Sequence, residues 1–167
     1  WKRNKPLIEE QVSKWKNQNH LVPHIHTSTI SDKKQIIENF NIPEENIDVI
    51  PYGVDHDKFR PSENKESVRN KICHHYYLKE KPYFVHISER NWARKNTLGL
   101  FEAFRKAKSN GMQHNLLVVG KNDDVVWKKA KTIPGIVMCG YVSEEIMINI
   151  IQGADALVLP SLHEGFG

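Results

Sequence analysis

The chain has 167 residues, of which 39% are apolar and 26% charged, a composition typical of a globular domain and not of a disordered or fibrous chain. No apolar run approaches the roughly 18 residues needed to cross a bilayer. The net charge is +4, and residues 51–110 carry 13 basic but only 7 acidic side chains. That excess suits an anionic ligand, a membrane surface or a nucleic acid, and it also fits a merely solvated basic face.

Both ends of the chain indicate a fragment. The first residue is Trp1 and not an initiator methionine, and Gly167 falls inside an apparent loop motif. We therefore expect the chain to carry only part of the machinery of a longer protein.

The first 61 residues predict a small α/β unit followed by a connection. Apolar periodicity predicts a helix, a strand, a second helix and a second strand, over residues 5–18, 24–30, 31–40 and 47–50. Ser31 or Asp32 is expected to cap the second helix. Residues 51–61 have proline at both ends, one glycine and several charges, which is typical of a connection between two structural units.

The remaining residues alternate regularly between helices and strands. Apolar runs predict strands over residues 83–87, 116–119, 136–139 and 156–159. Amphipathic segments predict helices over residues 63–77, 97–109, 123–131 and 144–152. One helix is expected to face the core with Leu100, Ala103, Phe104 and Ala107. This alternation predicts an α/β fold, with a Rossmann-like parallel sheet covered by helices on both faces.

The loops that follow the predicted strands share one edge of such a sheet. They are residues 88–96, 120–124, 140–143 and 161–167. Ligands of open α/β sheets bind outside the carboxyl ends of the strands, so this edge is the predicted working face. The last of these loops is expected to follow a buried strand at residues 156–159.

The first of these loops predicts an anion site. Arg90, Arg94 and Lys95 crowd it just before a helix that should begin near Asn96 or Thr97. Unpaired N–H groups and the positive end of the helix dipole both favour phosphate at such a place. The alternative is that these are surface cations paired with Glu89 or Glu102. The chain contains neither a Gly-x-x-x-x-Gly-Lys loop nor a Gly-x-Gly-x-x-Gly fingerprint, which argues against a P-loop NTPase and a nicotinamide dehydrogenase.

Other reactive residues form weaker patterns. Glu164 could accept hydrogen bonds from sugar hydroxyls or could cap a following helix. His24 and His26 lie at alternate positions of a strand, but they lack the further ligands that a metal site requires, so no metal is expected. Cys73 and Cys139 have no metal-like spacing and predict structural thiols in a reducing compartment, hence a cytoplasmic location.

Five motifs in order along the chain resemble those of a known family. They are VIPYGVDHDKF, ERNWARKN, LLVVG, GYVSEE and ADALVLPSLHEGFG. Together they are similar to the retaining glycosyltransferases of family 4, the glycosyl transferases group 1, which have the two-domain GT-B fold. The resemblance covers about residues 25–167. It implies that residues 1–61 are the end of an N-terminal acceptor domain plus the interdomain connection. Residues 62–167 would be the first part of a donor-binding domain, so the GT-B fold is truncated.

The resemblance also implies roles for individual residues. Arg90 and Lys95 match the family's arginine and lysine that hold the donor diphosphate, and Glu164 matches the first glutamate of the Glu-x7-Glu pair near the donor sugar. Tyr141 and Val142 stand where the family binds the nucleotide base. The further residues expected to bind the donor are Gly120, Ser161, His163, Gly165, Phe166 and Gly167. Glu89 departs from the family pattern, which commonly has glycine there, and the second glutamate of the pair lies beyond the chain.

The function implied is a retaining glycosyltransferase that moves a sugar from a nucleotide-diphosphate-sugar donor to an acceptor. The acceptor is a glycan, a lipid or a small molecule, and a peripheral membrane contact is left open. Neither a cofactor nor a metal is expected, because Arg90 and Lys95 would neutralise the diphosphate. Nucleic-acid binding is not expected, because the basic segment is not interleaved with stacking aromatics. The alternative is a non-catalytic nucleotide-binding or protein-interaction module, and the fragment alone is expected to be inactive.

Overall fold

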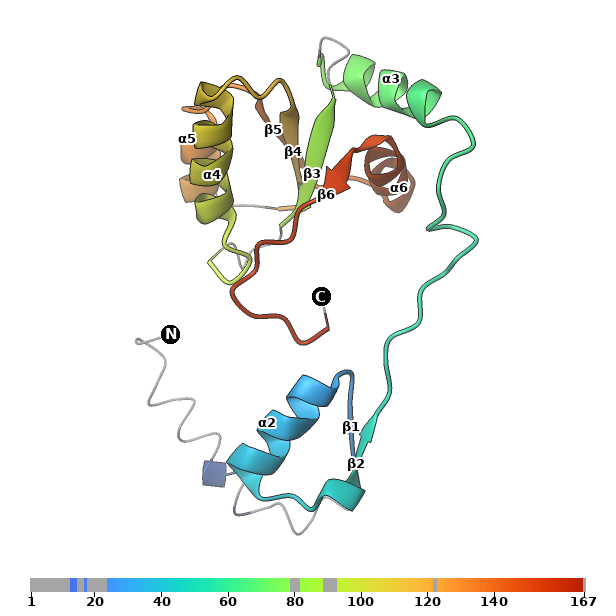
Figure 1. Ribbon diagram of the computed structural model, residues 1–167, viewed down its shortest axis with the longest axis vertical. Coiled ribbons are helices and arrows are strands. Elements are labelled where there is room, and N and C mark those ends of the chain that lie inside the picture. Colours follow the sequence, from blue (N-terminus) through green and yellow to red (C-terminus); the bar gives the residue numbers. More distant parts are fainter. Residues whose placement is uncertain are drawn as a thin grey trace. The chain divides into compact units, whose positions relative to one another are not determined.

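The computed structural model describes residues 24–78, 82–88, 93–121 and 123–166, together with Ser13, Lys14 and Asn17. These three isolated residues are helical, and the rest of the helix predicted over 5–18 lies outside the described residues. By its contacts the chain forms two compact units, one of residues 1–54 with 164–167 and the other of residues 55–163 (Figure 1).

The first unit contains a parallel pair of three-residue strands and one helix. Their bounds are β1 (Ile25–Thr27), α2 (Ile30–Phe40), a 3-10 turn (Glu44–Asn46) and β2 (Ile47–Val49). The predicted helix cap at Ser31 or Asp32 is wrong. Thr29 is extended and its side chain accepts a hydrogen bond of 3.0 Å from the Asp32 backbone N–H, so the helix begins earlier and the strand predicted over 24–30 is shorter.

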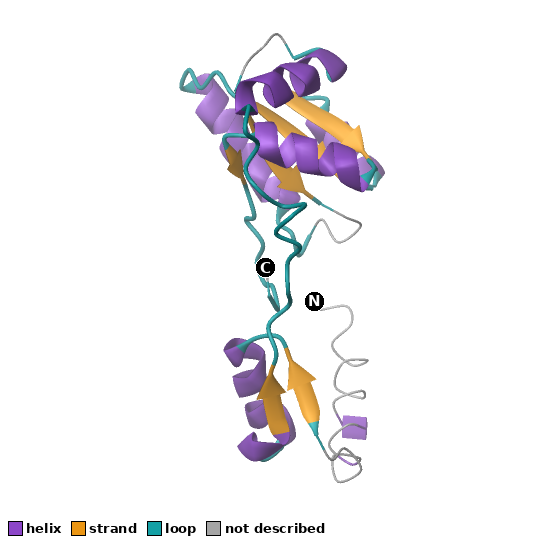
Figure 2. Ribbon diagram, turned by 90° about the vertical axis from the view of Figure 1, so that its right-hand side faces the viewer, coloured by secondary structure: helices purple, strands orange, loops and turns teal. Residues whose placement is uncertain are grey.

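The second unit is an α/β sandwich. Its elements are α3 (Lys65–His75), β3 (Tyr83–Ile87), α4 (Thr97–Ser109), β4 (Asn115–Val119), α5 (Asp124–Ala130), β5 (Ile136–Gly140), α6 (Glu144–Gly153) and β6 (Ala156–Leu157). The strands lie in the order β5-β4-β3-β6 and all pairs are parallel. Figure 1 shows α4 and α5 against one face of this sheet and α3 and α6 against the other, and Figure 2 shows the helices and strands of this unit from the side. The predicted α/β fold with a parallel sheet and helices on both faces is confirmed.

Alternate residues of the strands pack against the two helical layers. In β4, Leu117 and Val119 belong to the cluster with α3 and α6, whereas Leu116 and Val118 belong to the cluster with α4 and α5. Both faces are therefore buried, which explains why these strands are near-continuous apolar runs in the sequence.

Two details of the predicted core are wrong. On α4 the fully buried apolar side chain is Phe101, which was not predicted, while Ala103 is exposed. The strand predicted as buried over residues 156–159 is only two residues long, and Leu157 and Leu159 are 43% and 46% exposed. Within the described residues, β6 pairs with β3 on one side and no described strand lies on its other side.

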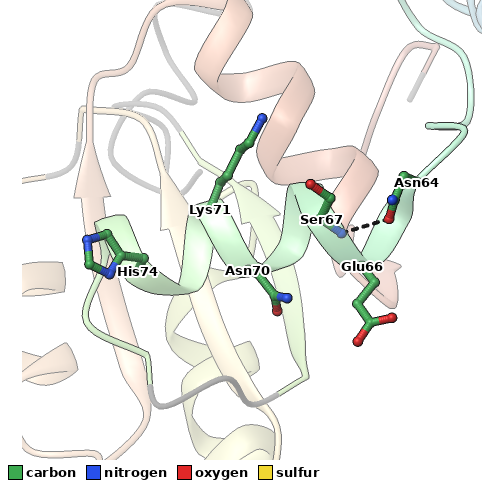
Figure 3. A pocket seen from close by; sticks show the side chains of 6 residues that line it. All are labelled: Asn64, Glu66, Ser67, Asn70, Lys71 and His74. Carbon is green, nitrogen blue, oxygen red and sulfur yellow. Dashed lines mark hydrogen bonds between the residues drawn. The ribbon is translucent and has the colours of Figure 1, made fainter.

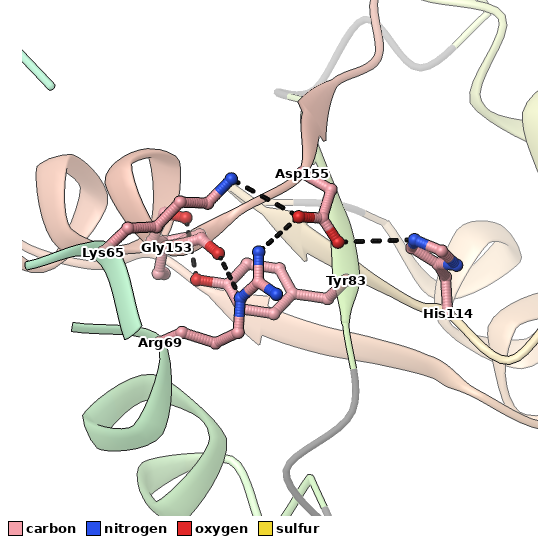
Figure 4. Close-up of polar contacts among 7 residues, drawn as sticks. Lys65, Arg69, Tyr83, His114, Gly153 and Asp155 are labelled. Carbon is pink, nitrogen blue, oxygen red and sulfur yellow. Dashed lines mark hydrogen bonds and ion pairs between the residues drawn. The ribbon is translucent and has the colours of Figure 1, made fainter. Parts of the chain in front are cut away.

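A polar cluster lies at the amino edge of the sheet, the end at which its parallel strands begin (Figure 4). Asp155, just before β6, pairs with Arg69 of α3, with Lys65 at 3.3 Å and with His114 at 3.3 Å. Arg69 Nε also donates a hydrogen bond of 2.9 Å to the carbonyl of Gly153. These bonds join α3, α6 and the segments that enter β4 and β6.

Candidate functional site

The four loops predicted at one edge of the sheet do meet there in their described parts, because all four strands run in the same direction. Backbone hydrogen bonds continue past the strand ends. The N–H of Ser88 donates to Val119 O at 2.8 Å, and the N–H of Gly120 donates to Gly140 O at 2.7 Å. The carboxyl edge is therefore well ordered where the loops begin.

The start of α4 is the most distinctive feature of this edge. The helix begins at Thr97, as predicted, and Asn96 stands at its N-cap in the left-handed conformation with φ 53°. The Asn96 side chain does not cap the first turn, and its Nδ2 instead donates to Pro160 O at 3.2 Å. Gly99 leaves room for this arrangement, since an added Cβ would lie 2.3 Å from Asn96 Oδ1. The first-turn N–H groups can thus face an anion.

The loop after β3 is tied to the loop after β6. The N–H of Leu162 donates to Arg94 O at 2.9 Å, and Arg94 Nη1 donates to His163 O at 3.0 Å. Both Arg94 and Lys95 are half-buried in the turn that precedes α4. Arg94 therefore joins the two loops, and Lys95 places a cation beside the helix start.

A buried polar network lies under the same turn. His86 in β3, Ser88 and Thr97 are all fully buried. His86 Nδ1 is 2.9 Å from Val158 O, its Nε2 is 3.0 Å from Thr97 Oγ1, and Ser88 Oγ is 2.9 Å from Thr97 Oγ1. Burial lowers the pKa of His86, the Val158 bond opposes this, and the charge of Lys95 lowers it further. Sequence reasoning missed this network, although a histidine inside the apolar run YFVHI was a signal.

The loop after β5 displays one aromatic side chain. Gly140 turns the chain with φ 69°, and Tyr141 is then 87% exposed. Val142 packs against the core cluster formed with α3 and α6, and Ser143 caps α6. Tyr141 is thereby presented at the carboxyl edge from an anchored segment. Gly120, which follows β4, is buried and has a φ of 118°.

The loop after β6 divides between the two units. Ser161 and His163 belong to the second unit, and Ser161 Oγ is buried with no hydrogen-bond partner within the described part of the chain. Glu164, Gly165 and Phe166 belong to the first unit, where the ring of Phe166 stacks edge-on against Tyr52 at 5.3 Å. Glu164 is half-buried, while Gly165 and Phe166 are exposed.

The structure therefore brings Lys95, Ser161 and His163 to one edge, through the bonds of Arg94 and Asn96. Arg90 and Gly167 lie outside the described residues, as does Glu89. The predicted convergence of Arg90, Lys95 and Glu164 on one rim stays a prediction. Glu102, weighed above as a partner of the loop arginines, pairs with Arg105 at 3.0 Å and with Lys129.

Other surface features do not lie at this edge. A hollow of about 520 Å³ on the outer face of α3 is lined by polar side chains from Asn64 to His74 (Figure 3). In the first unit, His24 Nε2 lies 2.8 Å from Asp48 Oδ2. Within the described ranges, no group of three or more His, Cys, Asp and Glu side chains is arranged to hold a metal ion.

Among the described helices, none has the length and apolar character required to span a bilayer.

Comparison with known proteins explains this arrangement. The family model described as glycosyl transferases group 1 matches residues 81–167, which include β3 to β6 and the whole carboxyl edge. The chain belongs to this family. The resemblance stated from the sequence motifs is therefore confirmed.

One curated relative of this group 1 chain is an Escherichia coli protein named UDP-Gal:alpha-D-GlcNAc-diphosphoundecaprenol alpha-1,3-galactosyltransferase. The two are 29% identical over 142 residues, which are 80% of this chain and 35% of that protein. The chain thus spans about a third of the length of the curated relative that it matches.

Solved structures share the fold. A glycosyltransferase from Rickettsia africae has a TM-score of 0.76 and 24% identity, covering 92% of this chain and 42% of that one. The Anabaena protein Alr3699/HepE, solved in complex with UDP and glucose, has a TM-score of 0.71 and 14% identity, covering 86% and 39%. The parallel sheet and its helices thus match the Rossmann-like half of a GT-B glycosyltransferase.

Proposed function

We propose that this chain is part of a retaining glycosyltransferase that moves a sugar from a nucleotide-diphosphate-sugar donor to an acceptor. In this proposal residues 1–61 are the end of the acceptor domain with the interdomain connection, and residues 62–167 are the first part of the donor-binding domain. The group 1 family match supports the transferase class, and the E. coli relative is named for a UDP-sugar donor.

The observation that carries the proposal is the start of α4. A lysine, Lys95, stands directly before a helix N-terminus that its own Asn96 does not cap, at the carboxyl edge of a parallel sheet. A helix N-terminus binds phosphate through its unpaired N–H groups and its dipole, and a neighbouring ammonium adds a full charge. A donor diphosphate is the ligand that this combination suits best.

The same groups would also accelerate the reaction. Breaking the bond between the sugar and the diphosphate leaves more negative charge on the phosphate oxygens, so a fixed cation stabilises the transition state more than the bound donor. One preorganised contact of this kind contributes about 3 kcal/mol, or roughly 10²-fold in rate. In the proposal Lys95 and Arg90 supply that charge, so that no metal ion is required.

The remaining roles follow the four loops. Tyr141 and Val142 contact the base, and Glu164 binds the donor sugar. The other donor contacts come from Gly120 and from the loop after β6, namely Ser161, His163, Gly165, Phe166 and Gly167. The leaving phosphate helps to deprotonate the acceptor on the same face, which gives retention at the anomeric carbon.

The nucleotide is proposed from the relatives. The E. coli protein is named for UDP-Gal, and the Anabaena structure holds UDP and glucose, so UDP is the first nucleotide to try. The acceptor is proposed as a glycan, lipid or small molecule. Cys73 and Cys139 are thiols and not half-cystines, which supports a reaction in the reducing cytoplasm.

The test uses the full-length protein that carries this chain. Calorimetry with UDP, GDP and ADP measures binding, and release of UDP from UDP-sugars with and without candidate acceptors measures turnover. Binding of UDP together with sugar transfer supports the proposal. Binding without hydrolysis or transfer favours the non-catalytic nucleotide-binding module, and the absence of binding to every nucleotide overturns both.

A further inference from the structure

The segment after β6 is held in place by side chains more than by strand pairing. The ladder between β3 and β6 contains only two pairs, Phe84 with Ala156 and Val85 with Leu157. Beyond it the N–H of Val158 donates to Val85 O at 2.8 Å, and Val158 O accepts from His86. A short edge strand fixes little of the chain that follows, so these bonds decide where the next loop runs.

The direction of every hydrogen bond in the buried network can be derived. Val158 O is a carbonyl and can only accept, so His86 Nδ1 carries the proton and Nε2 is the acceptor. The hydroxyl of Thr97 must then donate to Nε2, and its oxygen accepts from the hydroxyl of Ser88. One tautomer of a neutral imidazole is thus compatible with these partners.

This network connects two loops of the carboxyl edge. Thr97 is the first residue of α4 and follows the turn that holds Lys95 and Asn96. Val158 leads through Pro160, the acceptor of the Asn96 side chain, into the loop that Arg94 also contacts. The imidazole of His86 therefore stands between the helix start and the last loop, and it bonds to both.

We propose that His86 is a positioning residue for the donor site: through Thr97 and Val158 it holds the start of α4 and the exit of β6 in one geometry. In that geometry Lys95 and the first amides of α4 meet the donor diphosphate. The inference rests on the proposed function, and it adds three buried side chains, those of His86, Ser88 and Thr97, that act without contacting the donor themselves. His86, Ser88 and Thr97 are completely buried, so their contribution is to place the groups above them.

The test removes one hydroxyl and measures UDP binding in the full-length protein. Thr97→Val keeps the shape of the side chain but leaves the buried His86 Nε2 without the Thr97 hydroxyl, so UDP binding should weaken about tenfold. Thr97→Ser restores the hydroxyl and should bind UDP within about twofold of the wild type.

Tyr83→Phe is the matched control, because it removes a buried hydroxyl at the start of β3, which donates to Ile150 O of α6 at 2.9 Å. Both Thr97→Val and Tyr83→Phe should lower the melting temperature, but only Thr97→Val should lower UDP affinity. Equal UDP affinity in the wild type and Thr97→Val overturns the inference, as does equal weakening in Tyr83→Phe. If the wild type binds GDP or ADP in place of UDP, the same variants are compared with that nucleotide. If it binds none of the three, the proposed function fails and the inference fails with it.

Discussion

The two edges of the four-stranded sheet use their polar residues differently. At the amino edge, Asp155 is surrounded by Arg69, Lys65 and His114, and these charges compensate one another within the fold (Figure 4). At the carboxyl edge, buried hydrogen bonds of His86 and Thr97 hold the backbone, while side chains such as Tyr141 face solvent.

We infer from this difference that polar residues at the amino edge stabilise the fold, whereas those at the carboxyl edge can bind a ligand. Charges that satisfy each other have little left to offer a ligand, whereas an uncapped helix start with an adjacent lysine still favours an anion. Substitutions at the amino edge should therefore change the free energy of unfolding and leave nucleotide affinity alone. Substitution of a side chain proposed to contact the donor at the carboxyl edge, such as Lys95, should change nucleotide affinity or turnover more than stability.

The largest effect is expected from Lys95→Ala. Loss of a cation at the developing phosphate charge should lower the rate of sugar transfer by about 10²-fold, without a comparable loss of stability. The control is Lys106→Ala, which removes the same charge from the last turn of the same helix. Turnover measured with a UDP-sugar should fall in the first variant only. Unchanged turnover in Lys95→Ala would remove Lys95 from the proposed phosphate site.

The next largest effect is expected from Gly153→Ala, a substitution at the amino edge that should lower the free energy of unfolding. An added Cβ would lie 2.4 Å from the Tyr83 hydroxyl and 3.1 Å from the Arg69 Cα, both in the closed interior. The gain in helix propensity is at most about 1 kcal/mol, and the steric cost exceeds it, so unfolding free energy should fall by about 2–3 kcal/mol.

Urea unfolding measures this loss. Gly53→Ala is the control, because no atom lies within 4 Å of its added Cβ, and its effect should stay within about 0.5 kcal/mol. UDP affinity of folded Gly153→Ala should equal that of the wild type. A large drop in affinity at unchanged stability would contradict the separation of the two edges.

A smaller loss is expected from Asp155→Asn. Although desolvation would raise the pKa of Asp155, hydrogen bonds and charges from Arg69 and Lys65 hold that pKa below its ordinary value of 3.8. Because the native state keeps this carboxylate ionised, its stabilisation is present above pH 3.8 and is lost as the pH falls through the lower folded value. The partly exposed cluster should contribute about 1 kcal/mol at pH 7.

Unfolding of both forms at pH 7 and in acid provides the measurement. The difference between wild type and Asp155→Asn should shrink as the pH falls below 3.8. The control is Asp57→Asn, at an exposed position of the second unit, which should leave the free energy of unfolding at pH 7 nearly unchanged. A constant difference across the range would mean that the Asp155 charge is not what stabilises the edge.

Much of the sheet could be predicted because burial on both faces leaves a plain signal. The runs at β3, β4 and β5 and the bounds of α4 agree with the sequence to within a residue. The apolar run at β6 has the same appearance, yet in the described residues only Ala156 and Leu157 of that run pair with β3. In α4 two apolar stripes overlap, and only the sheet decides that Phe101 is buried and Ala103 is not.

The candidate site also has features that could be predicted from the sequence and features that could not. That Lys95 and the loop with Ser161 share an edge follows from parallel strands, a property of the chain pattern. The hydrogen bonds of His86 do not follow from that pattern, because they join its side chain to the Thr97 hydroxyl and to the Val158 carbonyl, 11 and 72 residues away. Likewise, the cap of α2 was wrong because Thr29, Ser31 and Asp32 are all good capping residues, and only the backbone conformation selects Thr29.

The smallest effect is expected from His86, whose titration connects the stability of the fold with the geometry of the carboxyl edge. Burial and the charge of Lys95 lower the pKa of His86 against the opposing Val158 bond, so the unfolded chain binds this proton more readily than the native one. The free energy of unfolding should therefore fall as the pH drops below 6.5, the ordinary pKa of a histidine. Above pH 6.5, His86 should add no pH dependence to the free energy of unfolding.

His86→Gln removes the titration, so its stability should depend less steeply on pH between about 7.5 and 5.5. Parallel stability curves for the two forms would show that the native state accepts a charged imidazole between Thr97 and Val158. The fixed tautomer on which the carboxyl edge is built would then be wrong.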